Sequence, residues 1–148
     1  MTRLSLFLRR NRRLALDTSV FIYQLEVNPR YVVFTDHIFD WLEQPGHYAV
    51  TSTSTMTELL VQPYRDSHQE RVDRFYAFLS TYPNLEWIAP DLEAADIAAR
   101  LRAKHRLRTP DALQAATAVQ ARVSGLVTND ADFQRVEDFE TLLLEDLV

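Results

Sequence analysis

Cysteine is absent from this 148-residue chain, and glycine occurs only twice, at Gly46 and Gly125. Without cysteine there is no disulfide, no thiolate zinc site and no cysteine nucleophile. Two isolated glycines cannot build a P-loop or a dinucleotide-binding fingerprint. No apolar run approaches the roughly 18 residues that a membrane-spanning helix needs, and the N-terminus lacks the cleavage site of a secretory signal. We therefore expect an untargeted, cytoplasmic protein.

Positive charge is scarce beyond the first 16 residues. Five arginines precede the first acidic residue, Asp17, which leaves 11 basic against 21 acidic residues and a formal charge of −10 from Asp17 onward. This negative net charge argues against a broad basic surface for nucleic-acid binding, although a local basic groove is compatible with it. We expect residues 1–13 to form a basic N-terminal extension, either a solvated arm or a contact for RNA or a partner, and residues 14–148 to form a single domain.

Apolar runs alternate with helical periodicity along the chain. We expect strands at residues 14–16, 48–52, 85–89, 125–128 and 141–145. We expect helices at residues 20–25, 31–42, 53–61, 68–80, 91–105 and 110–123, and a short one at 130–136. Continuous apolar strands between helices predict an α/β fold with a mainly parallel sheet covered on both faces. In such sheets, ligands bind outside the carboxyl ends of the strands.

Four carboxylates map to that edge of the predicted sheet. Asp17 ends the first strand, Asp130 follows the strand "GLVT", and Glu58 and Asp111 lie early in two helices. Each also has an ordinary explanation. Asp17 and Asp130 could cap helices, Glu58 could close a capping box with Thr55, and Asp111 could favour the positive end of its helix.

The conjunction of these carboxylates points to a cation. Two ionised carboxylates about 4 Å apart repel by roughly 4 kcal/mol at an effective dielectric constant near 20. Clustering several is therefore unfavourable unless a cation or a shared proton compensates. Carboxylate oxygens suit Mg²⁺ or Mn²⁺, and such a site can activate water and stabilise a phosphoryl group without a histidine or a serine.

The motifs "LALDTSVFIY", "TELL", "RTPDALQAATAV" and "LVTNDADF" occur in an order that resembles the PIN-domain family, in particular the VapC-type ribonuclease toxins of VapBC toxin–antitoxin systems. The resemblance implies a three-layer α/β/α sandwich around a short, mainly parallel sheet. Such proteins usually begin shortly before the first motif, so residues 1–13 are either an added arginine-rich helix or arm, or the result of a start codon assigned too early.

The same resemblance implies Mg²⁺- or Mn²⁺-dependent hydrolysis of RNA phosphodiester bonds, with a 5′-phosphate and a 3′-hydroxyl as products. The metal-binding positions correspond to Asp17, Glu58, Asp111 and Asp130, and Asp132 falls on a further position that is often a ligand. The polar positions that orient metal, water or phosphate correspond to Thr18 or Ser19 and to Thr128. A cognate antitoxin protein and a homodimer are the implied protein partners.

Two further groups of residues are candidates for contacts. The basic stretch before Asp111 could bind phosphates that flank the scissile bond, or could simply be a solvated helix end; its members are Arg102, Lys104, Arg106 and Arg108. An antitoxin groove or a homodimer surface is predicted around a set of aromatic residues, namely Tyr31, Phe39 and Trp41 with Tyr64 nearby.

Two other functions compete with the nuclease. A haloacid-dehalogenase-like phosphatase would use Asp17 as a covalent nucleophile, but such enzymes need a second acid two residues further on, where this chain has Ser19. A catalytically silent PIN-like module that binds RNA or protein would keep the fold and use its carboxylates only as helix caps.

Overall fold

The computed structural model describes residues 2–148 and contains a five-stranded sheet in the order β3-β2-β1-β4-β5. The strands are β1 (Arg13–Leu16), β2 (Tyr48–Ser52), β3 (Leu85–Ile88), β4 (Gly125–Thr128) and β5 (Glu140–Leu143). All neighbouring strands pair in parallel, which confirms the expected sheet. Because β1 lies between β2 and β4, the residues that follow these three strands meet at one edge.

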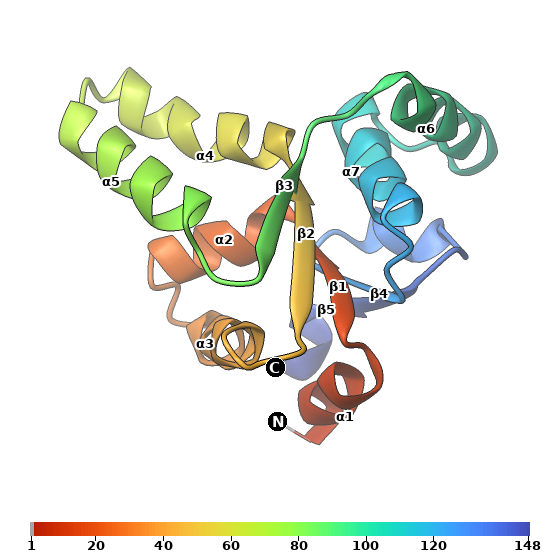
Figure 1. Ribbon diagram of the computed structural model, residues 1–148, viewed down its shortest axis with the longest axis horizontal. Coiled ribbons are helices and arrows are strands. Elements are labelled where there is room, and N and C mark those ends of the chain that lie inside the picture. Colours follow the sequence, from red (N-terminus) through yellow and green to blue (C-terminus); the bar gives the residue numbers. More distant parts are fainter. Residues whose placement is uncertain (1) are drawn as a thin grey trace.

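Helices cover both faces of this sheet, and Figure 1 shows the three layers with the sheet nearly edge-on. One face packs against α1 (Thr2–Arg10), α2 (Thr18–Leu25), α3 (Val32–Leu42), α4 (Thr53–Arg65) and α5 (Gln69–Ser80). The other packs against α6 (Leu92–His105), α7 (Thr109–Gln120) and the short 3₁₀ helix at Ala131–Arg135. Side chains alternate along a strand, so Leu14 and Leu16 of β1 join the first core and Ala15 joins the second. The predicted α/β/α sandwich is confirmed.

The N-terminal segment is a helix packed on the domain, so the alternative of a solvated arm is wrong. Residues 2–10 form α1, in which Leu4, Phe7 and Leu8 are almost completely buried. Their i, i+3, i+4 spacing places all three on one face of the helix, and the surrounding arginines conceal that pattern in the sequence. A Cβ at Gly125 would lie 2.7 Å from Phe7 Cζ, so this glycine permits the close contact of α1 with β4.

Several element boundaries differ from the expected ones; for example, α7 covers Thr109–Gln120 rather than residues 110–123. The second helix begins at Thr18 rather than at residue 20, and the last strand covers Glu140–Leu143, with Leu144–Leu147 forming a 3₁₀ helix. Helix α4 continues through Pro63 to Arg65. Proline cannot donate the backbone hydrogen bond of a helix interior, but the Pro63 ring is buried, which offsets that loss. Within residues 2–148, no helix is long and apolar enough to cross a bilayer.

The aromatic residues expected to line a docking surface are mostly inside the molecule. Phe39 and Trp41 are only 4% and 7% exposed, and the Trp41 ring stacks on His47 with a centroid separation of 4.4 Å. Tyr31 is half-buried and donates a hydrogen bond to Glu145, whereas Tyr64 is 59% exposed. The prediction of an α3 docking surface is therefore wrong for Phe39 and Trp41, because this face of α3 packs into the core.

Candidate functional site

The predicted carboxylates do converge at the carboxyl edge of the sheet. Asp17 follows β1 and begins α2, Glu58 lies in the second turn of α4, Asp111 lies in the first turn of α7, and Asp130 follows β4. The four residues are close enough to raise one another's pKa values by charge repulsion, in the pairs Asp17 with Glu58, Asp17 with Asp111, and Asp111 with Asp130. The ends of two strands and the early turns of two helices thus bring these groups together.

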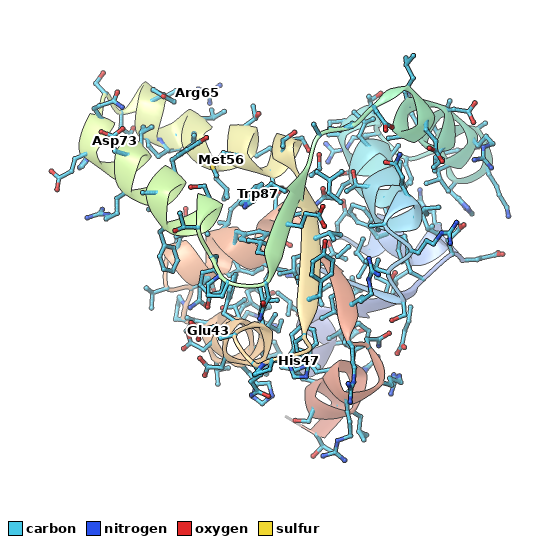
Figure 2. All side chains as sticks on the ribbon, viewed as in Figure 1. Glu43, His47, Met56, Arg65, Asp73 and Trp87 are labelled. Atoms are coloured by element: carbon cyan, nitrogen blue, oxygen red, sulfur yellow. The ribbon has the colours of Figure 1, made fainter. Side chains whose placement is uncertain are left out.

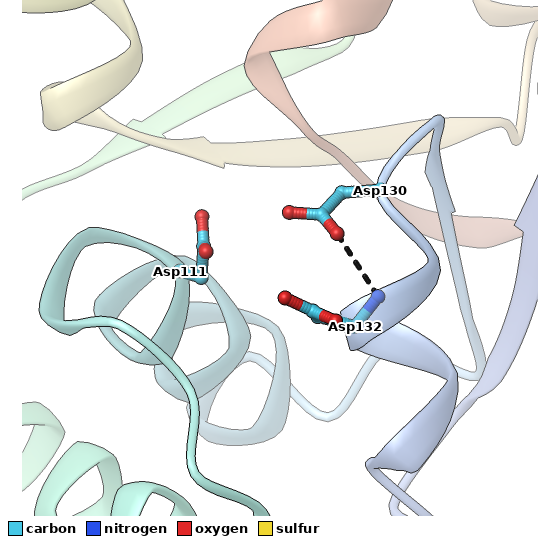
Figure 3. A group of neighbouring side chains, drawn as sticks. All are labelled: Asp111, Asp130 and Asp132. Atoms are coloured by element: carbon cyan, nitrogen blue, oxygen red, sulfur yellow. Dashed lines mark hydrogen bonds between the residues drawn. The ribbon is translucent and has the colours of Figure 1, made fainter.

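Three of the acidic side chains form the tightest part of the cluster. Asp111, Asp130 and Asp132 each offer a carboxylate oxygen, and these oxygens all lie within 4.8 Å of one another. Figure 3 shows Asp111, on α7, facing the other two, which lie on the loop and 3₁₀ helix after β4. All three are only partly exposed.

Asp17 is the most deeply placed of the carboxylates. Burial raises its pKa to about 6, against an ordinary value of 3.8, although a hydrogen bond from the Thr128 hydroxyl lowers it. The negative charges of Glu58 and Asp111 raise it further. In the described part of the chain no arginine, lysine or histidine forms an ion pair with Asp17. A buried carboxylate without a cationic partner is costly, so this position favours an added cation.

The other two central carboxylates are also shifted towards the neutral form. Burial raises the pKa of Glu58, and the charge of Asp111 adds to this effect, while the Thr18 hydroxyl and Arg108 oppose it. Burial likewise raises the pKa of Asp111, followed by the charge of Asp130.

Two arginines are the cations that pair with the cluster. Arg108 Nε lies 3.3 Å from Asp111 Oδ2, and Arg135 Nη2 lies 2.9 Å from Asp132 Oδ1. Their side chains are 78% and 50% exposed, so solvent screens much of their charge. Two screened arginines leave most of the negative charge of five carboxylates uncompensated.

Helix capping explains only one of these carboxylates. Asp130 Oδ1 accepts a hydrogen bond from the Asp132 backbone N–H at 2.9 Å, as a cap does. Asp17 is the N-cap residue of α2, but its side chain makes no capping hydrogen bond. The N-cap of α4 is Ser52, so Thr55 lies inside the helix and cannot form the capping box proposed for Glu58. The capping alternative therefore fails for Asp17 and Glu58.

The expected supporting residues lie around Asp17. The Thr128 hydroxyl donates to Asp17 Oδ2 at 2.7 Å and accepts from the Asp130 N–H at 3.0 Å. Thr18 Oγ1 lies 3.0 Å from Thr55 Oγ1, and Ser19 Oγ accepts from the Asn129 N–H at 3.2 Å. These contacts connect the residues after β1 with α4, through Thr55, and with the residues at the end of β4.

Of the four basic residues considered for RNA contacts, the structure pairs only Arg108 with the cluster. Arg102 Nε donates to the Leu107 carbonyl, and Lys104 lies 3.9 Å from Glu137, while Arg106 ends α6 in a left-handed conformation. Arg102 and Arg106 therefore contribute to the end of α6, whereas Arg108 lies beside Asp111.

Sequence reasoning missed a buried polar group behind the carboxylates. Gln114 is 4% exposed and contacts the carboxyl ends of β1 and β2 together with the hydroxyls of Thr51 and Thr55. The available signal was a lone glutamine within the alanine-rich run "ALQAATA", one helical turn after Asp111. Thr51 and Thr55 are likewise buried polar residues next to the site.

The donor set fits a hard divalent cation. Every candidate ligand atom is a carboxylate oxygen, the donor that Mg²⁺ and Mn²⁺ prefer. Three such oxygens already lie within 4.8 Å of one another, and Asp17 and Glu58 adjoin them. The residues present therefore fit a divalent metal ion.

Comparisons with known proteins agree with the fold and the arrangement of these motifs. The chain matches the PIN domain over residues 14–138, and it therefore belongs to the PIN-domain family. A comparison with curated proteins finds no significant relative.

Similar solved structures are toxin–antitoxin complexes. A chain of a toxin–antitoxin complex from Klebsiella pneumoniae is 20% identical, with a TM-score of 0.68 over 88% of this chain and 97% of that one. A chain of DNA-bound VapBC from Salmonella typhimurium is also 20% identical, with a TM-score of 0.68 over 89% and 98% of the two chains. A chain of VapBC-5 from Mycobacterium tuberculosis is 25% identical, with a TM-score of 0.59 over 89% and 98%. The resemblance to VapC-type PIN domains is thus confirmed in family and fold.

Proposed function

We propose that this protein is a metal-dependent endoribonuclease, and that Asp17, Glu58, Asp111 and Asp130, with Asp132, hold Mg²⁺ or Mn²⁺. The observation that carries the proposal is the convergence of five carboxylates at one sheet edge with only two exposed arginines as counter-charges. Membership of the PIN-domain family supports a nuclease rather than another phosphoester hydrolase.

When bound, the metal supplies positive charge that polarises a phosphate oxygen and makes water a stronger acid. In the reaction, the oxygen of water forms a bond to phosphorus, the bond from phosphorus to the 3′ oxygen breaks, and that oxygen takes up a proton. The products are a 5′-phosphate and a 3′-hydroxyl. Burial raises the pKa values of both Glu58 and Asp111, so each carboxylate accepts a proton, such as the one that the attacking water releases, more readily than a free carboxylate does.

Arg108 is the basic side chain best placed to bind RNA near these groups. It lies beside Asp111, and its side chain is 78% exposed. An exposed guanidinium at that place can bind a phosphate next to the scissile bond without itself touching the buried Asp17. Lys104 is also exposed, but it lies beside Glu137.

The test is RNA cleavage by purified protein. Total cellular RNA is incubated with the protein and Mg²⁺ or Mn²⁺, and the ends of the cut products are mapped. We expect discrete cuts that disappear with a chelator and in Asp17→Asn but persist in Asp96→Asn, a matched change of an exposed aspartate on α6. Cleavage that persists in Asp17→Asn contradicts the proposal. No cleavage and no metal binding would leave a silent binding module.

We further propose that the protein is a toxin held in check by an antitoxin protein, and that it acts in the cytoplasm, where RNA is available. Support comes from the similar structures, which are toxin–antitoxin complexes. An apolar groove of about 860 Å³ lies between α4, α5 and the edge strand β3; it is lined by Met56, Leu60, Val61, Tyr64, Tyr76 and Trp87. Figure 2 shows Met56 and Trp87 at this place, with Arg65 towards the far end of α4.

We assign the groove to an apolar segment of the antitoxin, with a second copy of this chain as the competing occupant. The change Tyr64→Asp should weaken binding of the purified antitoxin, whereas Leu92→Asp, on the exposed surface of α6, should not. If Tyr64→Asp instead dissociates a homodimer and leaves antitoxin binding intact, the groove belongs to the dimer.

A further inference from the structure

Three of the five N-terminal arginines fasten their segment to the rest of the molecule. Arg3 and Arg10 form ion pairs with acidic residues in the C-terminal part of the chain. Arg13 Nη2 donates to the carbonyl of the C-cap residue of α7 at 2.9 Å. Within residues 2–148, Arg9 and Arg12 form no ion pair. These two arginines therefore carry positive charge that no acidic partner in the described part of the chain offsets.

Arg9 and Arg12 line a small pocket between α1 and α3, together with His37 and His47. This arginine–histidine pocket has a volume of about 230 Å³, and no aspartate or glutamate belongs to its lining. Figure 2 shows His47 at the amino end of β2, on the side of the molecule where α1 and α3 lie. Both histidines are half-buried, whereas both arginines are exposed.

The acidic residues of the neighbouring helices do not neutralise this pocket. Helix α1 contains none. On α3, Asp36 Oδ1 accepts a hydrogen bond from Gln24 at 2.7 Å. Burial raises the pKa of Tyr82 to about 12, and the charges of the nearby Glu43 and Asp40 add to this effect, so these two acids lie close to Tyr82. The pocket therefore presents a local positive charge on a chain that is acidic as a whole.

One wall of the pocket is held in place by Trp41 and His47. Their rings stack nearly parallel, with centroids 4.4 Å apart. His47 Nδ1 lies 2.6 Å from the Trp41 carbonyl oxygen, which can only accept, so Nδ1 donates its hydrogen there. His47 Nε2 is left for a ligand, and it can accept from a protonated oxygen or, when the ring is charged, donate to an ionised one. Leu8 and Trp41, which are 3% and 7% exposed, also line the pocket.

A phosphate group is the ligand that suits these side chains. The planar guanidinium of arginine matches phosphate oxygens and can bind two of them at once. A volume of about 230 Å³ is below the roughly 300 to 1,000 Å³ of pockets for drug-sized ligands, so it suits a phosphate group better than a whole nucleotide. We propose that the arginine–histidine pocket is a phosphate-binding site, in which Arg9 and Arg12 hold the phosphate oxygens and His47 adds a contact.

This pocket is separate from the carboxylate cluster. Arg12 directly precedes β1 and His47 directly precedes β2, whereas Asp17 follows β1. Figure 1 shows α1 at the amino end of β1. The four residues of β1, at about 3.3 Å each, separate the two places by roughly 13 Å along the strand. A phosphate bound here is therefore not the scissile one. It comes either from a remote part of an RNA strand or from free phosphate, and neither source requires the metal site.

The first arm of the test uses inorganic phosphate and the fluorescence of Trp41. Trp87→Phe leaves Trp41 as the only tryptophan, and phosphate is added at constant ionic strength with chloride as the reference anion. We expect a saturable change that needs about tenfold more phosphate in Arg12→Gln, the loss typical of a hydrogen bond to a charged group. Arg74→Gln is the matched control, because Arg74 is an exposed arginine on α5 without an ion pair in residues 2–148. It should leave phosphate affinity unchanged.

The second arm uses a fluorescein-labelled single-stranded RNA in the presence of a chelator, so that binding is measured without cleavage. The otherwise unaltered chain is compared with the double variant Arg9→Gln/Arg12→Gln by fluorescence anisotropy at several salt concentrations. If an RNA phosphate occupies the pocket, the slope of log affinity against log salt should become shallower by about 0.7 in the double variant, the value for one phosphate contact on a single strand. Arg74→Gln should keep the slope of the unaltered chain.

The two arms together decide the proposal and name the source of the phosphate. A response of either arm to the changes at Arg9 and Arg12, but not to Arg74→Gln, supports it; a response to inorganic phosphate alone assigns the pocket to free phosphate. No response in either arm overturns the proposal, as does an equal response to Arg74→Gln. A loss confined to binding of the purified antitoxin also overturns it, because the pocket would then hold an acidic segment of that protein.

Discussion

The Thr128 hydroxyl donates a 2.7 Å hydrogen bond to Asp17 Oδ2, and it is the closest polar contact of the most buried carboxylate in the cluster. Thr128 ends β4 and Asp17 follows β1, so the bond joins adjacent parallel strands at their carboxyl edge. The same hydroxyl accepts from the Asp130 N–H at 3.0 Å. One side chain thus orients Asp17 and holds the backbone of Asp130.

Thr128→Val removes this hydroxyl and keeps the shape of the side chain. The pKa of Asp17 should rise, because the hydrogen bond from Thr128 lowers it. Divalent-metal affinity should fall by about tenfold, since groups that orient metal ligands commonly contribute that much. Thr128→Ser is the control and should bind Mn²⁺ nearly as well as the unaltered protein. Equal affinity of the valine and serine variants would contradict this role.

The raised pKa of Asp17 predicts that the metal-free protein loses stability as pH increases. The folded state holds the Asp17 proton up to a pKa of about 6, whereas the unfolded state releases it near 3.8. The folded state therefore binds more protons in this interval, and the free energy of unfolding falls as pH rises through it.

Asp17→Asn should remove that penalty. At pH 8 without metal, we expect the variant to be more stable by at most about 3 kcal/mol, from roughly 1.4 kcal/mol per pKa unit. The gain should shrink at pH 5, where Asp17 is largely protonated. Chemical denaturation at both pH values measures it, with Asp96→Asn as the exposed control. A variant less stable than the unaltered protein at pH 8 would be inconsistent with the burial of an unpaired charge.

Metal binding should weaken in acid, because Asp17 must lose its proton to act as a ligand. With a pKa of about 6, this group alone predicts about a tenfold loss of Mn²⁺ affinity between pH 7 and pH 5. Titrations at several pH values measure the slope. The residual binding of Asp17→Asn should depend less on pH, and an identical slope in the two proteins would show that another group controls the binding.

Phe7→Ala should destabilise the protein by about 3 to 5 kcal/mol, as removal of a buried aromatic ring does. Phe7 is 1% exposed and contacts the backbone at Gly125, so its loss leaves a cavity between α1 and β4. Leu6→Ala is the control on the same helix, because Leu6 is 50% exposed. Thermal and urea unfolding measure both. Equal effects of the two changes would mean that α1 does not belong to the cooperative core.

The sequence predicts the sheet and the carboxylates well because both depend on short-range patterns. The apolar runs ending at Leu16, Ser52 and Thr128 are strands, and the parallel order alone brings Asp17, Glu58 and Asp130 to one edge. The roles proposed for these residues remain predictions.

What the sequence does not show depends on contacts between distant segments. The three buried residues of α1 stand among arginines, so charge conceals an amphipathic helix whose partner, Gly125, lies far along the chain. From the sequence, Trp41 is a candidate for a surface contact, but it lies on the side of α3 that packs into the core. Gln114 gains its importance only when α7 packs across the ends of β1 and β2.

Calorimetric titration of the metal-free protein with Mn²⁺ at pH 8 tests most directly whether the carboxylate cluster is a metal site. We predict saturable binding that is lost or greatly weakened in Asp111→Asn, which removes one of the three closest carboxylates, and preserved in Asp96→Asn. The absence of saturable binding, or the same affinity in Asp111→Asn as in the unaltered protein, would contradict the metal site and the nuclease mechanism that depends on it.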